Sequence, residues 1–95
     1  MNIMICTYDD WKVEIKTHSI VVEKFGQKRE YDIPQWRDIE QNCEYIYITL
    51  PDESMLQFKM EFDDFFVGDK FDKNGEFVDT IANYVFEEEL EEDFD

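Results

Sequence analysis

Residues 45–62 read YIYITLPDESMLQFKMEF, and this stretch decides the fold. Apolar side chains alternate with Tyr, Thr or polar residues over 45–50, and the same alternation returns over 56–62. Strict alternation is typical of a strand with one buried face, and the intervening Pro51-Asp-Glu-Ser54 has the composition of a turn. The stretch therefore predicts a β-hairpin, with these side chains on its inner face: Ile46, Ile48, Leu50, Leu56, Phe58, Met60 and Phe62.

A second hairpin is predicted before it in the chain. Residues 11–16 alternate between apolar and charged side chains, Thr17-His18 fits a two-residue turn, and 19–25 form the returning strand. The expected register pairs Ile15 with Ile20, Val13 with Val22 and Lys12 with Glu23. The last pair joins opposite charges across the two strands, which stabilises this register. A polar turn is expected over 26–30, followed by brief pairing at 31–33.

A short helix is predicted near 34–42. Pro34 suits the first position of a helix, because its missing N–H would have no partner there. Trp36, Ile39 and Cys43 follow at i, i+3 and i+7, the spacing of an amphipathic helix that lays one stripe on a sheet.

Residues 72–78 allow two interpretations. Asn74-Gly75 between strand-like residues indicates a two-residue hairpin turn, which would place Phe71 opposite Val78. Alternatively, Asn74 caps a helix that begins at Glu76. We favour the hairpin. In either case Ile81, Tyr84, Val85 and Leu90 have helical spacing, so a C-terminal helix is expected near 80–90.

Together these elements predict an α+β fold for a single domain spanning 1–95, with a small antiparallel β-sheet built from hairpins. The hydrophobic content of 43% and aromatic content of 17% are too high for a disordered chain. We expect only the acidic residues 91–95 to fray.

Negative charge is concentrated in the last third of the chain. The formal net charge is -16, and residues 61–95 hold 14 Asp or Glu against Lys70 and Lys73 alone. Seven of the nine residues in 87–95 are acidic. If helical, that stretch spans about 13 Å, a length over which duplex DNA carries about eight phosphates. The carboxylate density therefore approaches that of DNA.

Acidic surfaces are repelled by nucleic acids and by anionic membranes, so the expected partner is a basic protein surface, such as that of a nucleic-acid-binding nuclease or effector complex. Direct binding of nucleic acid or membrane is not expected. Tyr45 and Tyr47 are candidates for an aromatic contact at the same interface. The candidate partner-binding residues are Asp63, Asp64, Asp69, Asp72, Asp79, Glu87, Glu88, Glu89, Glu91, Glu92, Tyr45 and Tyr47.

The sequence offers no constellation for catalysis, metal or cofactor binding, and we expect no enzyme. Cys6 and Cys43 are too few for a disulfide framework and are interpreted as buried thiols in a reducing compartment. A calcium loop around Gly75 would place Lys70 and Ile81 at two essential ligand positions. The sequence shows neither a signal peptide nor a run of ~20 apolar residues, so we expect a cytoplasmic protein.

In size, acidity and the pairing of a compact body with carboxylate clusters, the chain resembles small inhibitors encoded by phages or mobile elements that mimic DNA and block host defence nucleases. Anti-restriction and anti-CRISPR proteins belong to this group. The resemblance implies competitive inhibition in the host cytoplasm. Two alternatives are an immunity-type protein that neutralises a cationic toxin and a phage structural or accessory module whose hairpins and aromatic stripes form an oligomer interface.

Overall fold

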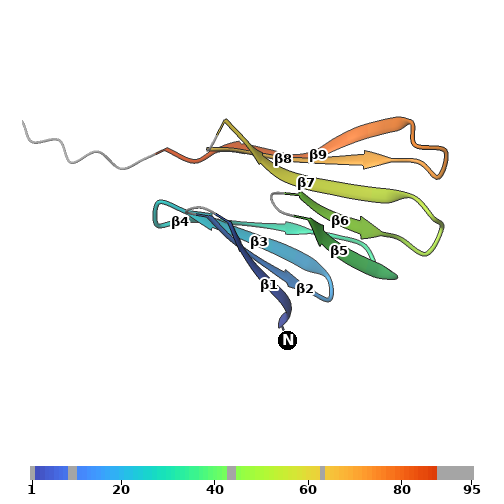
Figure 1. Cartoon of the computed structure of the whole chain (residues 1–95), viewed down its shortest axis with the longest axis horizontal. Coiled ribbons are helices and arrows are strands. Elements are labelled where there is room, and N and C mark those ends of the chain that lie inside the picture. Colours follow the sequence, from blue (N-terminus) through green and yellow to red (C-terminus); the bar gives the residue numbers. More distant parts are fainter. Residues whose placement is uncertain (1, 9–10, 43–44, 63, 88–95) are drawn as a thin grey trace, which may run out of the picture.

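The structure, a computed structural model, describes residues 2–8, 11–42, 45–62 and 64–87, and these form an all-β fold (Figure 1). One antiparallel sheet has the strand order β1-β2-β3-β4 and the other the order β5-β6-β7-β8-β9. Each strand thus pairs with the next along the chain within its sheet. The strands are β1 Asn2–Tyr8, β2 Trp11–Lys16, β3 Ser19–Lys24, β4 Gln27–Asp32, β5 Asp38–Asn42, β6 Tyr45–Thr49, β7 Met55–Glu61, β8 Phe65–Phe71 and β9 Phe77–Val85.

One hydrophobic core joins the inner faces of the two sheets. Trp11 of β2 and Tyr31 of β4 lie against Phe66 of β8, with ring centroids 6.1 and 6.0 Å apart. Phe66 in turn stacks on Phe58 of β7 at 5.7 Å. The fold is therefore a β-sandwich whose centre is aromatic.

Both hairpins predicted from alternation are confirmed. In the β2–β3 hairpin Ile15 pairs with Ile20, Val13 with Val22 and Lys12 with Glu23, as expected. The β6–β7 hairpin places Ile46 opposite Phe58 and Ile48 opposite Leu56, all four buried. The expected inward position of Phe62 is wrong: β7 ends at Glu61, and Phe62 is 84% exposed with a positive φ of 53°.

The predicted helix near 34–42 is wrong, because residues 38–42 form strand β5 on the edge of β6. Ile39 pairs with Ile48 and packs against the core, while Trp36 donates from Nε1 to the Lys16 carbonyl at 3.4 Å. A helix of about nine residues is marginal on its own. Pairing with β6 instead gives the backbone N–H and C=O groups of 38–42 hydrogen-bond partners along the strand, so the strand is favoured.

The predicted helix near 80–90 is also wrong: β9 covers residues 77–85, and the described chain contains no helix. Gly68 pairs with Ala82, whereas the next residue, Asp69, pairs with Thr80, so Ile81 is the extra residue of a β-bulge. That insertion breaks the two-residue alternation of the strand. Ile81 and Tyr84 consequently have the spacing of a helix in the sequence. Residues 88–90 lie outside the described chain.

The hairpin interpretation of residues 72–78 is confirmed, but its predicted register is wrong. Gly75 donates its N–H to the Asp72 carbonyl, and the Asp72 N–H bonds to the Glu76 carbonyl, both at 2.9 Å. Of the loop residues only Gly75 has positive φ. This is a three-residue loop ending in a bulge, which places Phe71 opposite Phe77 rather than Val78.

Two strands in the first sheet extend beyond the sequence predictions. Strand β1 was not predicted, and β4 begins at Gln27, where a polar turn was expected over 26–30. The actual turn is short, because Phe25 and Gly26 both adopt positive φ and reverse the chain at once. Lys28 and Glu30 of β4 face outward, and the Arg29 guanidinium lies over the Tyr84 ring of β9, with Cζ 4.2 Å from the ring centroid. Strand β4 therefore lacks the apolar alternation that identifies a strand.

Candidate interaction surface

The outward side of the β5–β9 sheet is the candidate interaction surface, and we call it the open face. Paired residues of neighbouring strands share a face of the sheet. One row of such pairs crosses all five strands, through Glu40, Tyr47, Gln57, Asp69 and Thr80. The alternate residues of β6 and β7 are buried, which fixes this row on the outside.

Carboxylates outnumber cations on the open face. Asp38, Glu40, Glu61 and Asp69 lie on it, while Lys59 supplies the positive charge among its described residues. Lys59 Nζ is 2.8 Å from Glu61 Oε2, and this bond, together with nearby carboxylates, raises the pKa of Lys59 above its usual value. Because Glu61 neutralises Lys59, the face remains negative.

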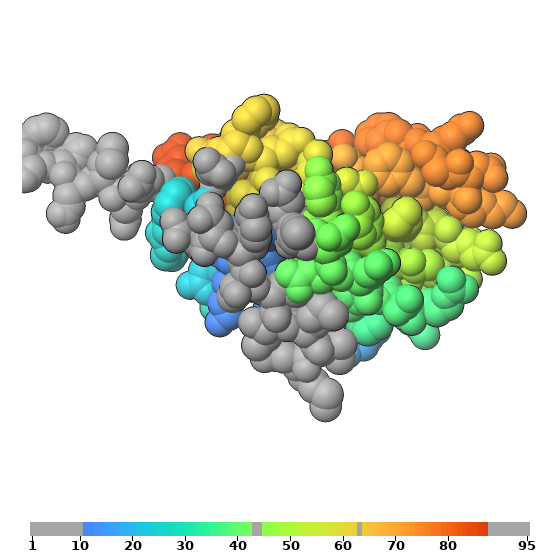
Figure 2. Space-filling model, in the orientation of Figure 1, coloured from blue at the N-terminus to red at the C-terminus, as the bar shows by residue number. Residues whose placement is uncertain are grey.

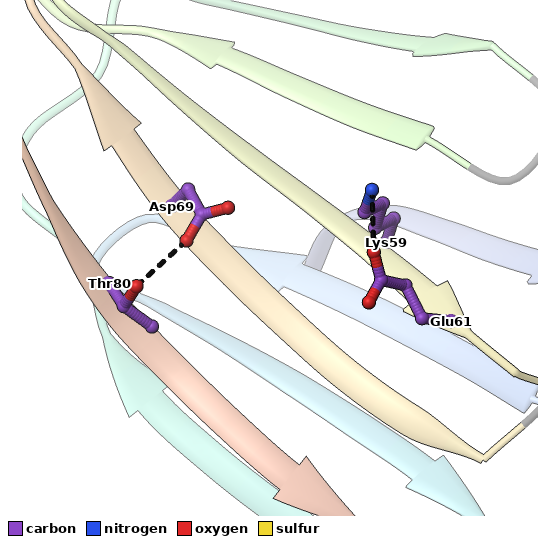
Figure 3. A network of polar contacts seen from close by, with 4 residues as sticks. All are labelled: Lys59, Glu61, Asp69 and Thr80. Atoms are coloured by element: carbon purple, nitrogen blue, oxygen red, sulfur yellow. Dashed lines mark hydrogen bonds and ion pairs between the residues drawn. The ribbon is translucent and has the colours of Figure 1, made fainter. Parts of the chain in front are cut away.

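Asp69 is held in place at the middle of this face. Thr80 on β9 donates its hydroxyl to Asp69 Oδ1 at 3.1 Å, as Figure 3 shows beside the Lys59–Glu61 pair. The Asp69 carboxylate therefore has a defined orientation but keeps further acceptor positions for a partner.

Tyr45 and Tyr47 lie on the open face, as the alternation predicted. Their rings stack with centroids 5.9 Å apart and planes inclined by 11°, and Lys59 Nζ lies 5.6 Å from the Tyr45 centroid. Both tyrosines are half-buried, and no helix of the described chain covers them. The pair forms a small aromatic platform beside Glu40.

The structure separates the other candidate acids rather than gathering them. Asp69 pairs with Thr80 and Asp79 with Lys70, so these two aspartates point to opposite faces. Asp64 lies just before β8, whereas Asp72 follows it, about 26 Å along the strand at ~3.3 Å per residue. Asp63, Glu88, Glu89, Glu91 and Glu92 lie outside the described residues.

Asp72 has a structural role in its turn. Its Oδ1 accepts the backbone N–H groups of Asn74 and Glu76, each at 2.9 Å. The structure thus assigns this carboxylate to holding the β8–β9 loop. Within the described part of the chain, no group of three or more His, Cys, Asp or Glu is placed to hold a metal ion.

Glu87, the last described residue, is fixed to the first sheet through Gln27 of β4. The Gln27 side chain donates to the Glu87 carbonyl and accepts the Glu87 N–H at 3.2 Å. The preceding Phe86 is fully buried, and its N–H bonds to the Asp64 carbonyl at 2.8 Å. The acidic run therefore starts from a firmly held point on the folded body.

The first sheet differs in its charge. Residues 11–32 hold five Lys or Arg and four Asp or Glu, whereas the described residues of 33–87 hold four basic and 11 acidic residues. On the outer side of the first sheet, Glu23 lies opposite both Lys12 and Lys28. The protein is thus polarised, with balanced charge on one sheet and negative charge on the other.

Asp38, Glu40 and Gln27 belong to these arrangements but were not among the sequence candidates. The alternation of Asp38, Glu40 and Asn42 with Ile39 and Gln41 is the signal that a strand interpretation of 38–42 would have used. Nothing in the sequence marks Gln27, because its role depends on the approach of β9 to β4.

Comparison of the chain with protein-family models, with curated proteins and with solved structures gives no match. As for membranes, none of the described segments is a helix of the length and apolarity needed to cross a bilayer.

Proposed function

We propose that this protein is an acidic inhibitor that binds the cationic nucleic-acid-binding surface of a host defence nuclease or effector complex. It acts by binding rather than by catalysis, in the cytoplasm. The observation that carries the proposal is the polarised charge, with 11 acidic against four basic residues in the described part of 33–87 and near balance in 11–32.

The rigidity of the acidic sheet supports this proposal. Fixed charges lose less conformational freedom on binding than charges on a floppy chain. Asp69 is oriented by Thr80, and Glu87 is anchored by Gln27. Six of the eight residues that follow Glu87 in the sequence carry carboxylates.

The proposed mechanism is competition for lysines and arginines that otherwise neutralise phosphates. Such binding is fast at low ionic strength and weakens steeply as salt screens the charges. The aromatic pair Tyr45 and Tyr47 adds apolar contact area at the same face, since Tyr is enriched at protein interfaces.

The experiment is an electrophoretic mobility assay in which the protein is titrated into purified restriction enzymes and CRISPR effector complexes bound to labelled duplex DNA. The proposal expects release of DNA from at least one of them, reversed when the concentration of the labelled duplex is raised. Changing Glu87, Glu88, Glu91 and Glu92 together to Gln should abolish the release and leave the circular dichroism spectrum unchanged.

Two results would argue against the proposal. Full activity of the tail variant with an unchanged salt dependence removes the role of residues 87–92. Failure to displace DNA from any enzyme, combined with rescue of cells from a cationic toxin, would favour an immunity protein.

A further inference from the structure

Strand β9 forms one edge of the five-stranded sheet, and among the described residues only β8 pairs with it. Its nine residues make it the longest strand, about 30 Å at ~3.3 Å per residue. An edge strand presents a row of backbone donors and acceptors to any chain that can pair with it.

The side chains of β9 leave this edge unprotected. Phe77, Val78, Ile81 and Val85 are 58, 50, 36 and 50% exposed, and the strand contains neither Lys, Arg nor Pro. Proteins usually protect sheet edges with charged residues, particularly Lys, or with Pro. The opposite edge of the same sheet, β5, does carry charges, in the sequence DIEQN. In the first sheet the edge strand β4 (QKREYD) is charged as well, whereas β1 (NIMICTY) is not. Strand β9 is therefore the apolar edge of the β5–β9 sheet.

The end of the β8–β9 hairpin projects beyond the core. Ala82 is the last buried residue toward the turn, and residues 73–81 are all exposed. In Figure 2 this end protrudes from the body in orange. A cluster of exposed apolar side chains on one element is typical of an interaction site, whereas single exposed apolar residues are common on any protein surface.

Carboxylates surround these apolar side chains. The β8–β9 hairpin carries four acidic residues, Asp69, Asp72, Glu76 and Asp79, and two basic ones, Lys70 and Lys73. The edge thus combines free backbone groups, exposed apolar side chains and net negative charge. Its complement is an extended segment that carries both apolar and basic side chains.

We propose that β9 is the docking edge for such a segment of the partner protein, which adds to the sheet as a further strand. Main-chain hydrogen bonds provide affinity in this mode, and alternate side chains provide specificity. The inference rests on the proposed function for the sign of the partner's charge and adds the mode of contact.

A second copy of the chain fits this edge less well. Each copy carries a net charge of -16, so pairing two β9 edges brings like charges together. A basic segment instead gains from the same carboxylates, and charge complementarity therefore selects it as the occupant.

The test uses a synthetic peptide of alternating Lys and Val, nine residues long, added to the ¹⁵N-labelled protein. The expected result is binding with slower hydrogen exchange of β9 backbone amides, because the added strand covers them. The double variant Val78→Lys, Ile81→Lys should bind about tenfold more weakly, since lysines on an edge block pairing. Both positions are exposed, so the variant should fold.

Glu30→Lys on β4 is the matched control, because it also raises the net charge by two and lies on the first sheet, away from the open face and from β9. It should keep most of the affinity and the β9 protection. Equal losses in both variants without β9 protection, or no binding of the peptide, would overturn the inference. Dimerisation of the wild type in sedimentation, abolished by the double variant, would assign the edge to a second copy and would also overturn it.

The proposed function is judged separately by the DNA displacement assay. Peptide docking along β9 without any displaced DNA supports the docking edge and removes the inhibitor role. Displaced DNA with full activity of the double variant and no protection of β9 retains the inhibitor role and removes the docking edge.

Discussion

Gly68 shows how one residue without a side chain permits the packing of the core. A Cβ at this position would lie 2.5 Å from Cε1 of Phe58 and 3.2 Å from the Ala82 Cβ. Phe58 is fully buried and stacks on Phe66, so its ring has no room to withdraw. Glycine in the middle of β8 thus allows the aromatic centre of the sandwich to form.

Gly68→Ala should destabilise the protein by about 1–3 kcal/mol, the usual effect of overpacking a core. Urea unfolding followed by tryptophan fluorescence measures the change. Asn83→Ala, at an exposed position on the neighbouring strand, is the control and should have little effect. Equal stability of Gly68→Ala and wild type would show that Phe58 can move.

The Lys59–Glu61 pair gives a pH dependence whose sign follows from the pKa. The pKa of Lys59 is raised from 10.5, first by the hydrogen bond that Lys59 donates to the Glu61 carboxylate. A raised pKa means that the pair stabilises the folded protein below pH 10.5, and that this contribution is lost as pH rises through the folded pKa. Both side chains are partly exposed, so the contribution should stay below about 1 kcal/mol.

Glu61→Gln should therefore lower the unfolding free energy at pH 8, and the difference from wild type should vanish above the raised pKa. Urea denaturation across this pH range makes the comparison. A difference that persists unchanged at the highest pH would mean that Glu61 acts through packing rather than through the ion pair.

Among the elements, strands with uninterrupted alternation were predictable and those with a bulge or little apolar content were not. Residues 11–16, 45–50 and 56–61 alternate strictly, so both hairpins followed from the sequence, and the cross-strand pairs predicted for the first of them are those observed. Strand β9 was mistaken for a helix because Ile81 is inserted as a bulge. In strand β5 the apolar side chain that packs against the core is Ile39, and it is only partly buried. That pattern is too weak to outweigh a helix signal.

Of the candidate site, the outward position of Tyr45 and Tyr47 followed from the alternation, whereas the acids were predictable only as a composition. Their excess in the second half of the chain is visible in the sequence, but which of them share a face depends on the pairing of β7, β8 and β9 and on the bulge in β9. Placing Asp69 outward and Asp79 on the opposite face required the register of β8 and β9.

Gln27 connects two elements that are far apart in sequence, and its removal should loosen the end of β9. It accepts the Glu87 N–H and donates to the Glu87 carbonyl. In Gln27→Ala the Glu87 amide should exchange with solvent about tenfold faster, because an amide that loses its acceptor opens more readily. Nuclear magnetic resonance of the ¹⁵N-labelled protein measures this rate.

Gln27→Glu is the informative second variant. It keeps the acceptor for the Glu87 N–H but cannot donate to the Glu87 carbonyl. Its exchange rate should lie between those of wild type and Gln27→Ala. Identical rates in all three proteins would show that Gln27 does not hold Glu87 in solution.

In the molecule as a whole, both sheets are needed for the fold, but we assign binding to one of them. Both contribute to one core, but the net charge of the described chain resides on the β5–β9 sheet. In the sequence, β9 of this sheet is followed by the acidic residues 87–95. Negative charge that served only solubility would have no reason to avoid the first sheet.

The most direct measurement compares two triple variants in the DNA displacement assay on a nuclease that the wild type inhibits. Asp38→Asn, Glu40→Gln, Asp69→Asn removes three charges from the open face; Glu14→Gln, Glu23→Gln, Glu30→Gln removes three from the first sheet. The account predicts that the first variant inhibits at least about tenfold more weakly, with a shallower salt dependence, while the second stays close to wild type. Equal loss in both would contradict it, because total charge alone would then determine inhibition.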